Sequence, residues 1–141
     1  MNDKKWLLIF ICWLIATVST LGSLFFSEVM KFPPCILCWY QRIAMYPLVL
    51  VFLMGLFPFD KKVIKFSAPL VLVGLVIAIY HNLLYYNILP ESAAPCVSGI
   101  SCTTVQIQWL GFITIPFLSL MGFTLLTILL TLTYRTISRE K

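Results

Sequence analysis

Four long apolar stretches divide the chain. Residues 6–26 carry no charge, and further apolar stretches cover residues 39–59, 66–89 and 110–134. A helix of about 20 residues crosses the roughly 30 Å of hydrocarbon in a bilayer. The longest connector, residues 90–109, is too short for a soluble domain. The pattern therefore predicts an all-α fold, an integral membrane four-helix bundle that forms a single membrane domain over residues 1–141.

The composition argues against a soluble protein. Hydrophobic residues make up 61% of the chain and charged residues 11%, against about 45–50% and about 25% in soluble domains. The net charge of +5 does not indicate nucleic-acid binding, because the basic residues are scattered along the chain. The first stretch follows two lysines, as a signal peptide would, but its apolar run exceeds the roughly 7–15 residues of a signal. We therefore expect a retained first helix.

The basic residues predict the topology. Four spans place both termini on one side of the membrane, together with the loop at 60–65, and eight of the ten Lys and Arg residues fall on that side. Cytoplasmic loops carry the excess of positive charge. Both termini are therefore expected on the cytoplasmic side of the membrane, and the loops at 27–38 and 90–109 on its outer face. The eight are Lys4, Lys5, Lys61, Lys62, Lys65, Arg135, Arg139 and Lys141.

Four of the five cysteines form two close pairs on the expected outer face. Cys35 and Cys38 stand at the start of the second helix, and Cys96 and Cys102 lie in the loop before the fourth. Disulfides form and persist in oxidising compartments outside the cytoplasm. Cys12 lies inside the first helix, where a lone cysteine usually acts as a small packing residue.

The first pair has the spacing of a redox centre. Cys35 and Cys38 are separated by two residues and follow two prolines, which suit the entry to a helix. The free N–H groups and the dipole at a helix start favour a thiolate. Arg42 follows Cys38 by four residues and therefore shares its helix face. Its guanidinium could stabilise that thiolate and the oxygen of a reduced acceptor, or it could simply reach toward the interface.

The second cysteine pair could either transfer electrons by thiol–disulfide exchange or form a structural disulfide. Cys96 and Cys102 enclose five residues in an external loop, where most disulfides are structural. Two pairs on one face of a small membrane protein favour thiol–disulfide exchange between them. Electrons that reach Cys35 and Cys38 then need an acceptor. The chain has no haem, flavin or iron–sulfur motif, so a lipid-soluble quinone is the expected acceptor.

His81 is the one histidine and lies late in the third apolar stretch, at a depth similar to that of Arg42. It could hydrogen-bond a quinone oxygen or pass a proton. It could equally bond a neighbouring helix through Asn82 or Gln41. The sequence leaves both roles open.

The residues around the first pair resemble a known family. The string from Cys35 to Arg42, CILCWYQR, is similar to the active-site signature of the DsbB family of disulfide bond formation proteins, and the four spans match its topology. A tryptophan, leucine and glycine at 109–111, followed by Pro116, support the alignment. The length and the short second pair look most like the Bacillus-type members. The loop between Cys96 and Cys102 is much shorter than in the proteobacterial members, which bears on any relay step that needs a long segment there.

The resemblance implies a role for each site residue. Cys38 matches the cysteine that engages a ubiquinone or menaquinone, Cys35 its partner, and Arg42 the arginine that contacts the quinone. Cys96 and Cys102 match the pair that reoxidises a secreted or lipid-anchored DsbA-like thioredoxin-fold protein, with Cys96 forming the mixed disulfide. His81 is similar in position to a histidine near the quinone. The implied activity is that of a quinone-dependent thiol oxidase that draws on the membrane quinone pool and supports disulfide formation in secreted proteins.

Three other classes compete with this interpretation. A quinone or vitamin-K-epoxide-reductase-like protein also has four helices and cysteine pairs, but its C-x-x-C opens a later helix, whereas here the motif opens the second helix and is followed by Arg42. A metal transporter would place cysteines deep in its helices or on the cytoplasmic side, and only Cys12 does so. A membrane scaffold with two structural disulfides would not depend on Cys38 for thiol oxidation. We expect no metal site.

Overall fold

The computed structural model describes residues 3–29, 36–57, 60–86, 88, 90, 108–109 and 113–140. Its elements are α1 (Asp3–Leu24), a π-helical turn η1 (Phe25–Val29), α2 (Ile36–Leu56), α3 (Lys62–Tyr85), β1 (Gln108–Trp109), β2 (Ile113–Thr114) and α4 (Ile115–Arg139). Most of the two expected outer loops, and with them Cys35, Cys96 and Cys102, lie outside the described residues.

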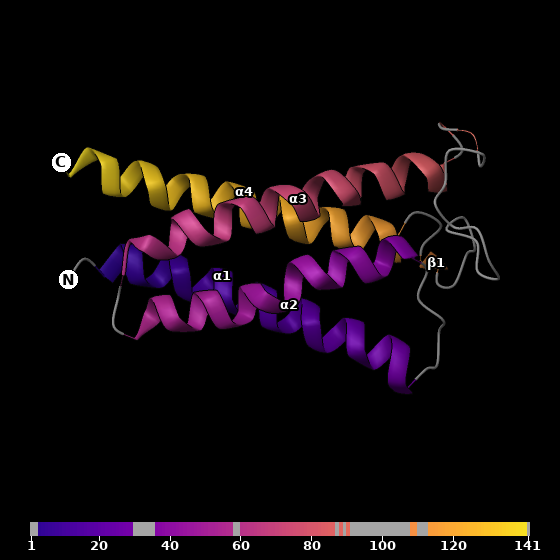
Figure 1. Cartoon of the computed structure of the whole chain (residues 1–141), viewed down its shortest axis with the longest axis horizontal. Coiled ribbons are helices and arrows are strands. Elements are labelled where there is room, and N and C mark those ends of the chain that lie inside the picture. Colours follow the sequence, from indigo (N-terminus) through magenta and orange to yellow (C-terminus); the bar gives the residue numbers. More distant parts are fainter. Residues whose placement is uncertain are drawn as a thin grey trace.

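The four helices run alternately up and down a single elongated bundle (Figure 1). Both ends of the chain and the turn between α2 and α3 lie at one end, here called the terminal end. The start of α2 and the approach to α4 lie at the other, here called the cysteine end because it holds Cys38. Each helix is long and apolar enough to cross a membrane. The expected all-α membrane four-helix bundle is therefore confirmed.

The helix boundaries follow local chemistry. The carboxylate of Asp60 accepts the backbone N–H of Lys62 at 2.9 Å, which satisfies one of the free amides at the start of α3. The fourth helix begins at Ile115, inside the apolar run that starts at residue 110. Before it, β1 and β2 pair as a short antiparallel ladder with Gln108 opposite Thr114. Pro116 is the second residue of α4, where the missing N–H costs nothing.

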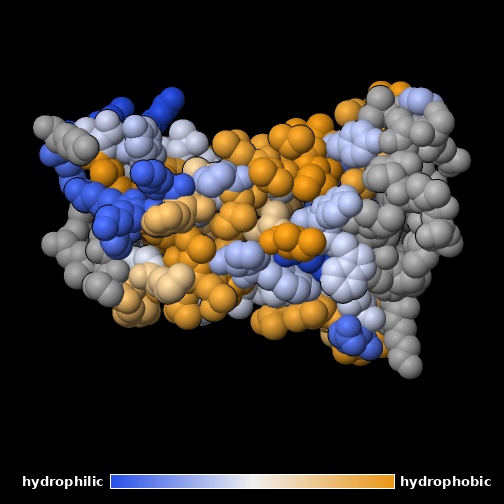
Figure 2. Space-filling model, in the orientation of Figure 1, coloured by the Kyte–Doolittle hydropathy of each residue, from blue (hydrophilic) through white to orange (hydrophobic). Residues whose placement is uncertain are grey.

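The outside of the bundle suits a bilayer. Hydrophobic side chains cover the middle of the visible face, and hydrophilic side chains gather at the terminal end (Figure 2). Large apolar side chains that point outward include Leu21, which is 61% exposed, and Val76, which is 65% exposed. In water such a surface would drive aggregation, whereas lipid tails cover it without cost. At the terminal end an ion pair joins Lys5 of α1 to Glu140, the residue that follows α4.

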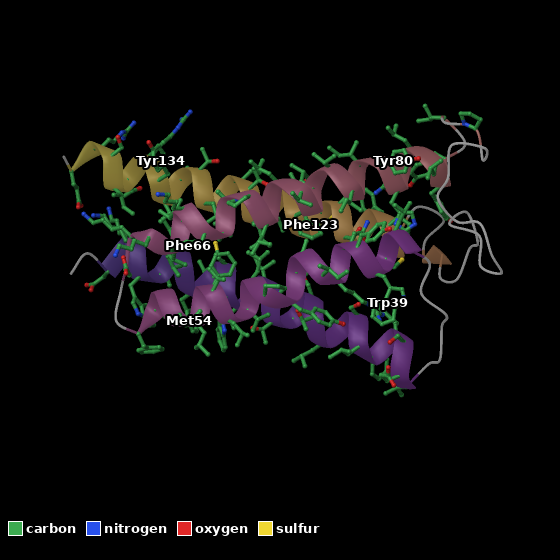
Figure 3. All side chains as sticks on the ribbon, viewed as in Figure 1. Trp39, Met54, Phe66, Tyr80, Phe123 and Tyr134 are labelled. Carbon is green, nitrogen blue, oxygen red and sulfur yellow. The ribbon has the colours of Figure 1, made fainter. Side chains whose placement is uncertain are left out.

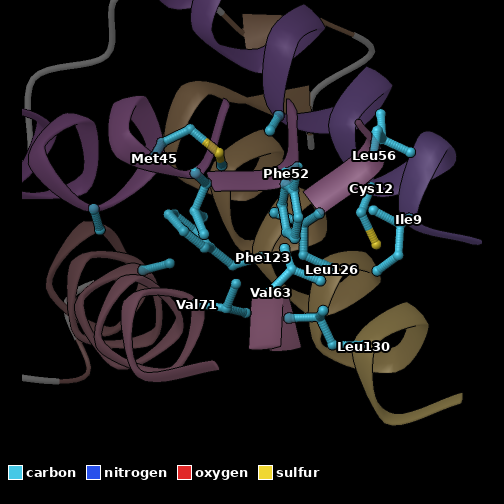
Figure 4. Packing of buried hydrophobic residues seen from close by; sticks show 14 residues of the cluster. Ile9, Cys12, Met45, Phe52, Leu56, Val63, Val71, Phe123, Leu126 and Leu130 are labelled. Carbon is cyan, nitrogen blue, oxygen red and sulfur yellow. The ribbon is translucent and has the colours of Figure 1, made fainter. Parts of the chain in front are cut away.

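The interior is a continuous apolar core that runs along the bundle axis. Phe52 from α2, Val71 from α3, and Phe123 and Leu126 from α4 are almost completely buried in it (Figure 4). Cys12 from α1 is fully buried in the same cluster. This position suits the packing role expected for Cys12.

Gly74 allows α3 to approach the ring of Phe123. A Cβ at this position would overlap that ring, which lies at the centre of the bundle (Figure 3). Gly74→Ala should therefore destabilise the protein by about 1–3 kcal/mol, the usual cost of overpacking a core. Thermal unfolding in detergent measures the effect. Gly122→Ala is the matched control, because the nearest atom to its Cβ is Ser19 Oγ at 3.7 Å. Equal melting temperatures for the two variants would contradict the prediction.

Candidate functional site

The cysteine end of the bundle holds Cys38, the one described member of the two expected pairs. Cys38 lies in the first turn of α2 and is partly buried. Its side chain lines a pocket of about 330 Å³. The position at a helix start agrees with the requirement that a reactive thiol be accessible and close to free backbone N–H groups.

The pocket lies between α1, α2 and α4. Its wall is largely apolar, with a few hydroxyl groups and one charged side chain, the composition expected of a small-molecule site. The α2 side of the wall carries Cys38, Gln41, Arg42, Met45 and Tyr46. The α1 side, including η1, carries Val18, Ser19, Gly22, Ser23, Phe26 and Ser27, and the α4 side carries Leu118, Ser119, Gly122 and Phe123.

Arg42 is the charged side chain in this wall. Its Nε donates to Ser23 Oγ at 2.9 Å and its Nη2 donates to the backbone oxygen of Ser23 at 3.0 Å. The guanidinium carbon also lies 5.3 Å from the centre of the Trp39 ring, within the range of a cation–π contact. The side chain is therefore held inward against α1 by two charge-assisted hydrogen bonds, rather than extended toward the interface.

His81 reaches the pocket through Gln41. His81 is 2% exposed and does not line the pocket, but its Nδ1 lies 3.3 Å from Nε2 of Gln41, which does. An amide nitrogen can only donate, so the ring nitrogen accepts in this arrangement. The structure thus contains the helix–helix contact with Gln41, one of the two roles that the sequence left open for His81.

Two pairs of adjacent residues link the four helices at this level of the bundle. Arg42 bonds α1 while its neighbour Gln41 bonds α3. His81 accepts that bond, and its neighbour Asn82 donates to the carbonyl of Pro116 in α4 at 2.8 Å. In a low-dielectric environment an unpaired polar group is costly, so these bonds restrict how the helices can pack. The residues that supply these side chains are here called the polar belt, and they lie beside Cys38: Ser23, Gln41, Arg42, His81 and Asn82.

The sequence did not single out the residues that form the α1 and α4 sides of the pocket. Ser23 and Gly22 in particular looked like ordinary small residues in an apolar helix. The available signal was their spacing, because Ser19, Ser23 and Gly22 fall within about one turn and small residues mark close helix contacts in membranes. No cluster of potential metal ligands occurs among the residues that the structure describes.

Comparison with known proteins identifies the family. The family model described as Disulfide bond formation protein DsbB matches residues 4–133. The chain belongs to the DsbB family. It is 48% identical over 120 residues to Disulfide bond formation protein C of Bacillus subtilis, covering 85% of this chain and 87% of the relative. The DsbB-family resemblance seen in the sequence is therefore confirmed, and the protein is a membrane thiol–disulfide oxidoreductase.

Other relatives extend the range of organisms. The chain is 42% identical over 116 residues to the Probable disulfide formation protein C of Halalkalibacterium halodurans, covering 82% of this chain and 85% of the relative. It is 37% identical over 130 residues to a Probable disulfide formation protein of Metapseudomonas resinovorans, covering 92% and 90%. No solved structure matches the chain. The DsbB-family assignment therefore rests on sequence similarity over most of the length.

Proposed function

We propose that this protein oxidises an extracytoplasmic DsbA-like dithiol and passes the electrons to a membrane quinone, and so supports disulfide formation in secreted proteins. One observation carries the proposal: Cys38 and Arg42 share the wall of an apolar pocket among helices that can span a membrane. A thiol and a fixed positive charge beside an apolar pocket suit electron transfer from a dithiol to an apolar acceptor.

The residues of the pocket fit a quinone head group. The volume of about 330 Å³ lies at the lower end of the range for small-ligand pockets. The apolar wall suits a ring, and Arg42 offers N–H donors to a carbonyl oxygen. A bound ubiquinone or menaquinone would supply the redox chemistry by accepting two electrons and two protons from a dithiol.

The cysteines of this chain would carry the electrons by disulfide exchange. A thiolate of the partner would attack the disulfide of Cys96 and Cys102, breaking it and forming a mixed disulfide between the partner and Cys96. The second partner thiol would then attack the mixed disulfide and release Cys96, leaving an oxidised partner and a reduced loop pair. The loop pair reduces the disulfide of Cys35 and Cys38 in the same way. The dithiol of Cys35 and Cys38 would close again to a disulfide by giving up two electrons and two protons to the acceptor.

Arg42 would stabilise negative charge at this site. A cation one helical turn from Cys38 stabilises the thiolate, and its N–H groups favour an oxygen that gains electron density during reduction. His81 would act through Gln41, by fixing the orientation of that amide at the pocket wall.

The cysteine end would face outward from a bacterial cell membrane. The terminal end carries Lys61 and Lys62 at the turn before α3 and Arg135 and Arg139 at the end of α4. More basic residues lie at the terminal end than at the cysteine end. Under the positive-inside rule this supports a terminal end that faces the cytoplasm. Such an orientation exposes the cysteines to an oxidising compartment.

Quinone reduction by the purified protein tests the proposal. A reduced thioredoxin-fold partner is added in detergent, and quinone absorbance is followed with ubiquinone and menaquinone analogues in parallel. We expect partner dithiol and quinone to be consumed in equal molar amounts, because each exchanges two electrons. No quinone reduction by protein that contains both disulfides would reject the oxidase and favour structural disulfides.

A further inference from the structure

The side chain of Arg42 is bound along one edge of its guanidinium group. Nε and Nη2 both donate to Ser23, one to its hydroxyl and one to its backbone oxygen. A guanidinium has five N–H donors, so three remain, two on Nη1 and one on Nη2. Among the residues that the structure describes, none is found to accept a bond from Nη1. Because Arg42 lines the pocket, we take these N–H groups to be the ones that a ligand there would meet.

Ser23 lies just before the point at which the first helix changes from α-helical to π-helical pairing. The π-helical turn begins two residues later, at Phe25, and runs to Val29. In a π-helix each carbonyl is paired with the fifth residue along the chain instead of the fourth, and such turns occur frequently at functional sites. A carbonyl near this change of pairing can accept a bond from outside its own helix, as that of Ser23 does from Arg42.

A third contact limits the remaining freedom of the arginine. The Trp39 ring lies 5.3 Å from the guanidinium carbon. An arginine side chain has many rotamers, and part of that conformational entropy is lost when it binds a ligand. Contacts with Ser23 and Trp39 remove that freedom before any ligand arrives, which is the condition for effective electrostatic stabilisation.

We propose that Ser23 is a positioning residue, which holds Arg42 so that its free N–H edge meets a carbonyl oxygen of the quinone. The inference rests on the proposed function, because it names the residue that orients the arginine of that same site. Ser23 also lines the pocket, but the proposed role is exerted through Arg42 and needs no direct contact with the acceptor. This distinction can be measured, because a residue that works through another loses its effect when the other is removed.

A double-mutant cycle between Ser23 and Arg42 is the test. Ser23→Ala should raise the Michaelis constant for quinone by about three- to tenfold, the effect of losing one hydrogen bond to a charged group. Arg42→Met should raise it at least as far. Ser23→Ala made in the Arg42→Met protein should add nothing further. Ser23→Thr, which keeps a hydroxyl, should restore the wild-type value.

The control is a buried serine that lies outside the pocket and has no contact with Arg42. Ser67 in α3 is fully buried, its hydroxyl bonds the carbonyl of Ile64 at 3.4 Å, and it does not line the pocket. Ser67→Ala should leave the Michaelis constant unchanged. Thermal unfolding of the four proteins of the cycle, without quinone, should show coupling between Ser23 and Arg42, because the bonds exist in the free protein.

Each outcome separates the positioning role from the proposed function. Additive effects of Ser23→Ala and Arg42→Met on the Michaelis constant would overturn the positioning role while wild-type turnover upholds the oxidase. Failure of Ser23→Thr to restore the constant would also count against it. A wild-type protein that reduces no quinone would overturn the oxidase and the positioning role together, even if unfolding still showed the contact.

Discussion

Cys38→Ser is expected to lower the rate of quinone reduction by at least about a thousandfold, since without the Cys38 thiol no Cys35–Cys38 dithiol can give its electrons to the acceptor as it closes to a disulfide. The side chain lies in the pocket wall with Arg42, and the serine would keep its size while removing its redox chemistry. The initial rate of quinone reduction in the presence of excess reduced partner is the measurement. Thermal unfolding of the same protein shows whether the fold survives.

Cys12→Ala provides the matched cysteine control. Cys12 lies near the middle of α1, is fully buried in the core and does not line the pocket. We expect Cys12→Ala to keep the wild-type rate, with at most a modest fall in melting temperature from lost packing. A Cys38→Ser protein that reduced quinone as fast as Cys12→Ala would remove Cys38 from the electron path.

Gly22→Phe is expected to raise the Michaelis constant for quinone by about tenfold or more, because it places a bulky ring inside the ligand pocket. Gly22 lines the pocket, and a Cβ built there has no atom within 4 Å. The added side chain therefore enters open space instead of disturbing a packed contact. The melting temperature should stay close to that of the wild type, and quinone titrations of the initial rate measure the effect.

Two further variants distinguish occlusion of the pocket from a general effect of adding an aromatic ring to α1. Leu21→Phe puts the same side chain on the same helix at a position that is 61% exposed and outside the pocket lining, so its kinetics should match the wild type. Gly22→Ala adds only a methyl group and should have a small effect. Unchanged quinone kinetics in Gly22→Phe would mean that the acceptor binds elsewhere.

The polar belt gives a physical reason for the position of the pocket. Asn82 donates both to Ala78 in its own helix and to Pro116 in α4, and Gln41 joins α2 to α3. These bonds tie α3, which does not line the pocket, to α2 and α4. Where α1 and α4 face the pocket they present the small residues Ser19, Gly22 and Gly122, which leave space between the helices. Space therefore opens beside Cys38.

The sequence alone determined the membrane fold and much of the chemistry. Hydropathy over about 20 residues is a local property, so four spans could be counted without knowing how they pack. The helix register that places Cys38 and Arg42 on one face is also local, because it depends only on their separation along α2. The start of α4 was harder to place, because an apolar run continues through β2 into the helix.

Only the tertiary structure decided which faces of the helices meet. Ser23 and Arg42 are separated by 19 positions in the chain, and Gln41 and His81 by 40, so no local pattern pairs them. In an all-apolar bundle the rotation of each helix depends on a few small residues and polar contacts, which many registers could satisfy. The role of Ser23 beside Arg42, and the pocket itself, arise from that choice of packing.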